Sequence, residues 1–267
     1  MKMAQKRVRG AALSHRGRCL LVVLILCGIF HASPGCAEEQ QNAVALDGLW
    51  TRQETLLSIG VVGAAGLASL WDEDFRSEMR RNRSSSIDHL ADGFDLLGHP
   101  ATGLGASALL WGVGTWRDDP HLAQTGQLAF EAVFLSQAAT AVVKVGFGRH
   151  RPDADEDAWS FRPLSFSDPR HSLSSAHTAN AFALAGVLSS RSRKTWTPWL
   201  YYGLAGLVGA SRVYDDEHWL SDVMVGALIG ELSARIAVRF HEDNPGYFFG
   251  PTPIGQDGYG LRVGARW

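Results

Sequence analysis

Cysteine is scarce in this chain of 267 residues, and its placement excludes several kinds of chemistry. All three cysteines, Cys19, Cys27 and Cys36, lie in the first 36 residues. Beyond them the sequence can form no disulfide and no cysteine-based metal site, and it supplies no thiol nucleophile. An excess of positive charge is also lacking, because the formal net charge is −2. Without a basic face there is no electrostatic case for nucleic-acid binding.

The first forty residues have the pattern of an export signal. A basic stretch precedes an apolar run from Cys19 to Phe30, which is too short for a comfortable membrane span. Small residues then lead to Ala37, so we predict a signal peptide over residues 1–37 that is cleaved after Ala37. Lipoprotein processing before Cys36 and an uncleaved anchor are the alternatives. We therefore expect an exported protein, either periplasmic or membrane-associated.

Long apolar runs are scarce as well, but shorter ones recur from residue 50 onward. They can form about six core helices of an all-α bundle, separated by polar segments such as Asp72–Arg83. The runs are Leu56–Trp71, Leu96–Trp116, Ala132–Val143, Thr178–Ser190, Thr195–Ser211 and Trp219–Gly230. Only Leu96–Trp116 and Thr195–Ser211 approach the roughly 18 residues of a membrane span. This slightly favours a soluble or peripheral bundle over a polytopic membrane protein.

The last residues of the chain change character. From Tyr259 to Trp267, apolar side chains alternate with glycine and arginine, which is the period-two pattern of a strand. Asp257 and Gly258 offer a turn back to Tyr247–Phe249. We predict a helical domain over residues 38–245 and a short C-terminal β-hairpin over residues 246–267, packed on the bundle. An outer-membrane sorting signal ending in Trp267 is the alternative.

The first of three polar clusters lies at the end of a predicted helix. Lys144 closes the helix, and Arg151 follows in a loop fixed by Pro152. A phosphoryl group in transfer spreads negative charge over three oxygens, and fixed cations stabilise that charge. Taken alone, the pattern fits a solvated basic helix end better than a binding site.

The second cluster, from Ser172 to Thr178, directly precedes an apolar helix. Serines in this place are natural N-caps, and a helix N-terminus with free N–H groups is a ready anion site. His177, in the first turn, can donate a proton to a leaving oxygen. Taken alone, the cluster fits an ordinary cap beside an exposed histidine.

The third cluster places His218 and Asp222 four residues apart, hence on one face of a helix. An unpaired carboxylate in an apolar helix is unfavourable, so we expect Asp222 to bond His218 and fix its tautomer. The other ring nitrogen is then free to attack. Arg212 precedes the helix and can clamp oxygens in bidentate fashion. The acidic residues Asp215–Glu217 are expected to be exposed and to raise the pKa of His218.

Together the three clusters resemble the signature of the type 2 phosphatidic acid phosphatase and vanadium haloperoxidase superfamily. That signature is a lysine, six residues and Arg-Pro, then Pro-Ser-Gly-His, then Ser-Arg, five residues, His, three residues and Asp. The first and third motifs match at every specified position and spacing. In the middle motif Ser174 replaces the proline and Ala176 the glycine, while Ser175 and His177 match. The resemblance covers roughly residues 55 to 240.

The resemblance implies a phosphatase that works with no cofactor and no metal ion. His218 would then attack phosphorus, Asp222 would orient it, and His177 would protonate the leaving alcohol. The phosphate oxygens would be held by Lys144, Arg151, Ser175, Ala176 and Arg212. Alanine at position 176 keeps the backbone N–H on which that contact depends, so the departure from glycine affects rate and substrate more than reaction type.

The substrate implied is a phosphate monoester, either a phosphorylated lipid or a small soluble ester, hydrolysed outside the cytoplasm. Two other interpretations stay open. The same residues can bind vanadate in a haloperoxidase, although those enzymes are generally larger. The chain can also be a non-catalytic envelope protein that retains the anion site. Nothing in the sequence indicates the oligomeric state.

Overall fold

The structure is a computed structural model that describes residue 48 and residues 50–154, 157–166, 169, 171–244, 247–254 and 258–265. The predicted signal peptide over residues 1–37 and the alternative lipidation site at Cys36 lie outside these residues. Within them the protein is mostly helical, which confirms the all-α fold class.

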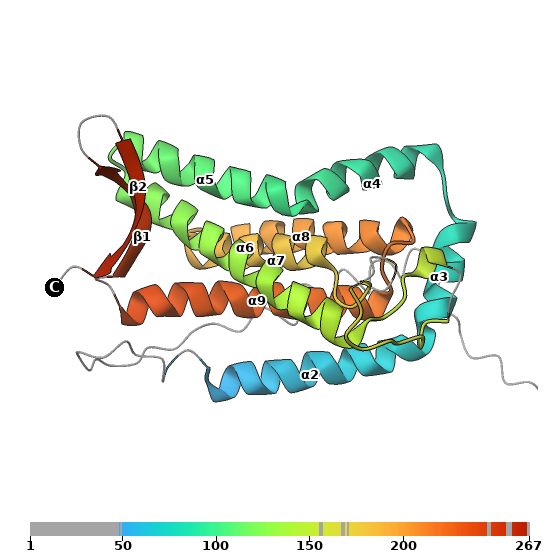
Figure 1. Cartoon of the computed structure of the whole chain (residues 1–267). Helices are drawn as coiled ribbons and strands as arrows, with labels where there is room; N and C mark the ends of the chain where they lie inside the picture. The colour runs from blue at the N-terminus through green and yellow to red at the C-terminus, as the bar shows by residue number, and fades with distance from the viewer. Residues whose placement is uncertain are drawn as a thin grey trace, which may run out of the picture.

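Helices α2 to α9 form an elongated bundle, with α4 and α5 along one side, α2 along the opposite side and α6 to α9 between them (Figure 1). The helices are α2 (Arg52–Ala68), α3 (Asp72–Arg81), α4 (Ser85–Gly98), α5 (Pro100–Trp116), α6 (Pro120–Phe147), α7 (Ala176–Ser190), α8 (Thr197–Tyr214) and α9 (Leu220–Asp243). The six apolar runs fall largely on these helices, but the described residues hold eight α-helices where about six core helices were predicted, because the charged stretch 72–81 is helical and the run Leu96–Trp116 is divided.

The charged stretch 72–83 is not the polar connection that its composition predicts. Residues Asp72–Arg81 form α3, with three acidic residues in the first turn and two arginines in the last. This order of charges stabilises a helix through its dipole. Asp72 is nevertheless buried, with 1% of its surface exposed. A buried carboxylate needs partners, and they come from the candidate site.

The apolar run Leu96–Trp116 is not one helix. α4 ends at Gly98 and α5 begins at Pro100, with His99 in an extended conformation between them. Proline lacks the N–H that would continue α4, and it holds the preceding residue extended. The end of α4 packs tightly on α7, since a Cβ at Gly98 would lie 3.1 Å from the Cβ of His177.

The core of the bundle centres on α7, which packs against α6, α8 and α9. Most of its side chains are buried, including the fully buried Phe182. Small residues permit the close approach of α9, because a Cβ at Gly226 would lie 2.6 Å from the carbonyl oxygen of Ser175. α6 and α8 end, and α7 and α9 begin, at the end of the bundle where α3 lies (Figure 1).

The C-terminal segment forms two strands, β1 (Tyr247–Ile254) and β2 (Gly258–Ala265), which pair antiparallel with Tyr247 opposite Ala265. The side chains of these two strands lie outside those that the structure describes. The packing of the hairpin on the bundle therefore stays a prediction.

Two stretches of the described chain, Arg52–Arg81 and Pro120–Phe147, are long and apolar enough to cross a membrane. A core helix of a soluble protein meets the same criterion, so length and composition do not decide between the two. The runs that come nearest to a span in the sequence, Leu96–Trp116 and Thr195–Ser211, are not among them. The first is divided at His99.

Candidate active site

The three polar clusters, far apart in the sequence, meet at the α3 end of the bundle. Lys144, near the end of α6, donates a hydrogen bond to the carbonyl oxygen of His171. The backbone N–H of Ser175 donates to the carbonyl oxygen of Asp222 at 3.2 Å. The first cluster therefore contacts the second, and the second contacts the third.

Ser175 is the N-cap of α7, as the serines before this helix predict. Its Oγ accepts hydrogen bonds from the Thr178 backbone N–H at 3.4 Å and from the Thr178 hydroxyl at 2.9 Å. Ser175 is fully buried, while Ala176 and His177 are half-buried. The first turn of α7 therefore presents a backbone N–H and an imidazole together.

The two arginines of the signature pair with carboxylates. Arg151 pairs with Glu217 through its Nη1. The Nη1 of Arg212 lies 2.7 Å from Asp95 Oδ1, and its Nη2 pairs with Asp215. Both guanidinium groups are therefore already partly neutralised by carboxylates. Within the described residues, no three His, Cys, Asp or Glu side chains are grouped as a metal site requires.

His177 lies beside a carboxylate and a second imidazole. Its Nε2 is 3.1 Å from Asp95 Oδ1, and its ring meets that of His99 edge to face, with centroids 5.5 Å apart. Burial and the charge of Arg212 lower the pKa of His177 to about 4, although Asp95 acts in the opposite direction. His177 in turn lowers the pKa of His218, so the two imidazoles share one electrostatic environment.

His218 lies just before α9 and is 4% exposed. Burial lowers its pKa well below the ordinary value, and the charges of Lys144 and Arg151 lower it further, while a hydrogen bond to the Ser172 backbone opposes them. The pKa increase expected from Asp215–Glu217 is therefore wrong. Their expected exposure is wrong as well, since Asp216 is buried and the other two are half-buried. Those three carboxylates pair with arginines, so they do not act on the imidazole as free charges.

Asp222 is fully buried, and its hydrogen-bond partners differ from the expected one. Its Oδ1 accepts from Arg149 Nη1 at 2.6 Å, and its Oδ2 accepts from Ser172 Oγ at 2.5 Å and from the Trp219 backbone N–H at 3.1 Å. Within the described chain, no hydrogen bond joins Asp222 to His218, and the Nδ1 of His218 has no partner. The buried carboxylate does need a partner, but a guanidinium group supplies it.

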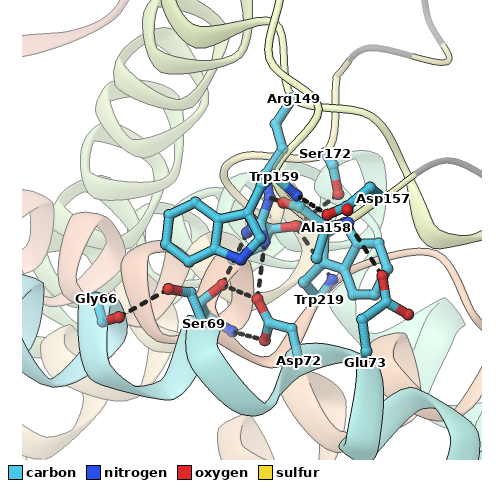
Figure 2. A network of polar contacts seen from close by, with 12 residues as sticks. Gly66, Ser69, Asp72, Glu73, Arg149, Asp157, Ala158, Trp159, Ser172 and Trp219 are labelled. Atoms are coloured by element: carbon cyan, nitrogen blue, oxygen red, sulfur yellow. Dashed lines mark hydrogen bonds and ion pairs between the residues drawn. The ribbon is translucent and has the colours of Figure 1, made fainter.

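Arg149 extends this contact to α3. Its Nη2 donates to Asp72 Oδ2 at 2.8 Å, and its guanidinium carbon lies 5.5 Å from the ring centroid of Trp219 (Figure 2). Neither Arg149 nor Asp72 is predicted as a site residue from the sequence. Arg149 stands between two signature cations, where it adds only another positive charge to a basic segment. Nothing in the sequence distinguishes Asp72 from its charged neighbours.

Asp95 was missed for a similar reason. It lies on α4, outside the three clusters, yet its carboxylate contacts both Arg212 and His177. The only local signal is an acidic residue in an apolar segment. That signal does not show which helix end the carboxylate faces.

Comparisons with known proteins agree on a family. The model of the PAP2 superfamily matches residues 127–245, which contain all three clusters. Lipid A 1-phosphatase of Porphyromonas gingivalis is 36% identical over 110 residues, or 39% of this chain and 22% of that protein. Lipid A 4'-phosphatase of the same bacterium is 24% identical over 118 residues, or 43% of this chain and 50% of that protein.

A solved structure, that of LpxE from Aquifex aeolicus, has a TM-score of 0.49 and 28% identity, covering 62% of this chain and 93% of that chain. The two curated relatives are matched over half of their length or less. The family match spans most of α6 and all of α7, α8 and α9, whose ends bring the signature residues together. By the family-model match, residues 127–245 of this chain belong to the PAP2 superfamily.

Proposed function

We propose that this protein is a phosphatase that hydrolyses a phosphate monoester of a lipid, with His218 as the nucleophile. The observation that carries the proposal is the meeting of the three clusters around the buried imidazole of His218. Burial and the charges of Lys144 and Arg151 also hold the pKa of this imidazole low. A neutral imidazole at physiological pH keeps the lone pair that a nucleophile needs. The same two cations provide the positive charge that a phosphate requires.

In the first step, a ring nitrogen of His218 forms a bond to phosphorus as the bond from phosphorus to the alcohol oxygen breaks. His177 gives its proton to that leaving oxygen. Positive charge and donors for the phosphate oxygens come from Lys144, Arg151, Arg212, Ser175 and the Ala176 N–H. The charge is supplied by side chains and a helix start, so the residues themselves can stabilise the transition state.

In the second step, His177 takes a proton from water as the water oxygen attacks phosphorus. The nitrogen–phosphorus bond breaks, its electron pair returns to His218, and inorganic phosphate leaves. Asp222 orients His218 through Ser172, whose hydroxyl bonds Asp222 and whose backbone bonds the His218 ring. An N–H held by a backbone carbonyl fixes the tautomer, so the other nitrogen carries the lone pair.

A lipid is the substrate class we favour, because apolar side chains face outward on several helices. The examples are Ile59 and Leu67 on α2, Leu109 on α5, and Phe134 and Val142 on α6, each more than half exposed. Exposed apolar surface of this extent suits contact with a membrane. The curated relatives are lipid A phosphatases by name. Export, with the site outside the cytoplasm, is part of the same proposal.

The direct test is phosphate release by the full chain in the presence of EDTA. Lipid A and phosphatidic acid in detergent micelles are compared with p-nitrophenyl phosphate. We expect activity that is insensitive to EDTA, with kcat/KM at least about tenfold higher for a lipid than for the soluble ester. Lack of release from all three substrates, or loss of activity in EDTA, would contradict the proposal.

Replacing Asp95 by asparagine is expected to move the alkaline limb of the pH profile to lower pH. Protonated His177 is needed to release the alcohol, so kcat/KM falls as pH rises through the pKa of His177. The Asp95 carboxylate raises that pKa, and its loss lowers the protonated fraction at any higher pH. A kcat/KM profile from about pH 3 to about pH 8 measures the shift.

Asp92→Asn is the matched control for this pH experiment. Asp92 is exposed one turn earlier on α4, and its charge raises the pKa of Asp215. We expect its alkaline limb to coincide with that of the parent. If Asp95→Asn and the parent have the same alkaline limb, His177 is not the acid that controls kcat/KM.

A further inference from the structure

We propose that Asp72 and Arg149 are positioning residues for the phosphatase reaction. Together they hold the carboxylate of Asp222 and, through Ser172, the ring of His218. The inference rests on the proposed function. Neither residue is specified by the superfamily signature, and Asp72 lies on α3, outside the part of the chain that the family model matches.

Three buried charges form the centre of this arrangement. Arg149 is 3% exposed, Asp72 is 1% exposed, and Asp222 is fully buried. The guanidinium group uses a different nitrogen for each carboxylate: Nη2 for Asp72 at 2.8 Å and Nη1 for Asp222 at 2.6 Å. One arginine therefore connects the start of α3 to the first turn of α9. Figure 2 shows its contact with Asp72.

Ser221 makes further hydrogen bonds to both Arg149 and Asp72. Its hydroxyl accepts from Arg149 Nη1 at 2.7 Å and donates to Asp72 Oδ2 at 2.5 Å. Its backbone N–H donates to Asp72 Oδ1 at 3.0 Å. Asp72 thus holds the first turn of α9 through both of its oxygens. His218 immediately precedes that turn, so a shift of the turn would move the nucleophile.

Ser172 connects the charges to the nucleophile itself. Its backbone N–H donates to the carbonyl oxygen of Arg149 at 3.1 Å, and its hydroxyl donates to Asp222 Oδ2. The backbone of Ser172 also makes the hydrogen bond to the His218 ring. Two members of the buried network, Arg149 and Asp222, therefore hold Ser172.

The charges also argue for a role beyond stability. Buried ion pairs are poor stabilisers, because removal from water offsets much of their attraction, and proteins in which the whole group is replaced by apolar residues are often as stable. The guanidinium group of Arg149 is shared by the carboxyl groups of Asp72 and Asp222, so its single positive charge is divided between two partners. If Arg149 bonded Asp222 alone, the two charges would cancel. Because Asp72 shares the guanidinium, negative charge remains near His218 to stabilise the positive ring of phosphohistidine.

The test is Asp72→Asn in the full chain, assayed with phosphatidic acid in micelles. The side chain keeps its shape but loses its charge. We expect kcat to fall about tenfold to a hundredfold and KM to stay within about twofold of the parent. KM should change little because Lys144, Arg151 and Arg212, which hold the phosphate, are untouched. A purely structural defect would not separate kcat from KM in this way.

Glu73→Gln is the matched control. Glu73 is the next residue of α3, and its Oε1 accepts from the backbone N–H of Ala158 at 3.0 Å (Figure 2). Arg149 Nε bonds the carbonyl oxygen of the same Ala158, so Glu73 holds the same loop without a contact to Asp222. We expect the kcat of Glu73→Gln to equal that of the parent.

A parent-like kcat in Asp72→Asn, or an equal loss of kcat in both α3 variants, would overturn the inference. If circular dichroism shows that Asp72→Asn does not fold, Ser221→Ala tests the same link, with an expected kcat loss of about threefold and a parent-like KM. A parent-like kcat there overturns the inference as well. If the parent chain releases no phosphate, both the proposed function and this inference fail. If the parent releases phosphate but Asp72→Asn has the same kcat as the parent, the inference fails and the proposed function stands.

Discussion

Replacing His218 by alanine is expected to lower kcat by about a thousandfold or more and to abolish the phosphorylated enzyme. The variant loses the nitrogen lone pair that forms the bond to phosphorus. Lys144, Arg151 and Arg212 remain, so the variant should still bind vanadate or inorganic phosphate as a competitive ligand. Rapid quench with labelled substrate, followed by detection of label on the denatured chain, measures the intermediate directly.

His241→Gln is a suitable control for this experiment. His241 lies at the far end of the same helix, where its Nε2 is 2.7 Å from Glu131 Oε2. Its loss should affect stability without touching the site, so kcat and the labelled intermediate are expected to match the parent. If His218→Ala still forms a labelled enzyme at the parent rate, another residue is the nucleophile.

The sequence predicts that His177, His218 and the signature cations lie close together because each of them lies at a helix end or within a few residues of one. Lys144 is near the end of α6, His177 is in the first turn of α7, and His218 directly precedes α9. Antiparallel neighbours in a bundle place the end of one helix beside the start of the next. Short-range spacing therefore suffices to bring these residues to one end of the molecule.

The partners of these residues depend on packing between distant segments. Asp72 and Arg149 are 77 positions apart, and their charges look like those of any solvated helix until the burial of both is known. The same limit explains the wrong pKa direction for His218. Its neighbours in sequence are acidic, but its neighbours in space are Lys144 and Arg151. Charges that are close in sequence therefore do not predict the electrostatic environment of a buried group.

The second large effect is expected for Arg149→Met, which should lower the free energy of unfolding by about 3–5 kcal/mol. Methionine fills a similar volume, but it leaves Asp72 and Asp222 buried without their shared cation. Two buried carboxylates close together also repel each other. Denaturant unfolding followed by circular dichroism at neutral pH measures the change. Arg80→Met is the control, since Arg80 is 53% exposed and its pair with Asp216 should contribute less than about 1 kcal/mol.

The loss of stability in Arg149→Met should shrink as the pH falls. Burial raises the pKa of Asp222 and Arg149 lowers it, so removal of Arg149 raises that pKa further above its value in the unfolded chain. A folded state with the higher pKa binds more protons, and its stability therefore decreases as pH rises between the two values. The variant should be closest to the parent in acid and furthest from it at neutral pH. A difference that is constant with pH would show that lost packing, rather than an unpaired buried carboxylate, causes the effect.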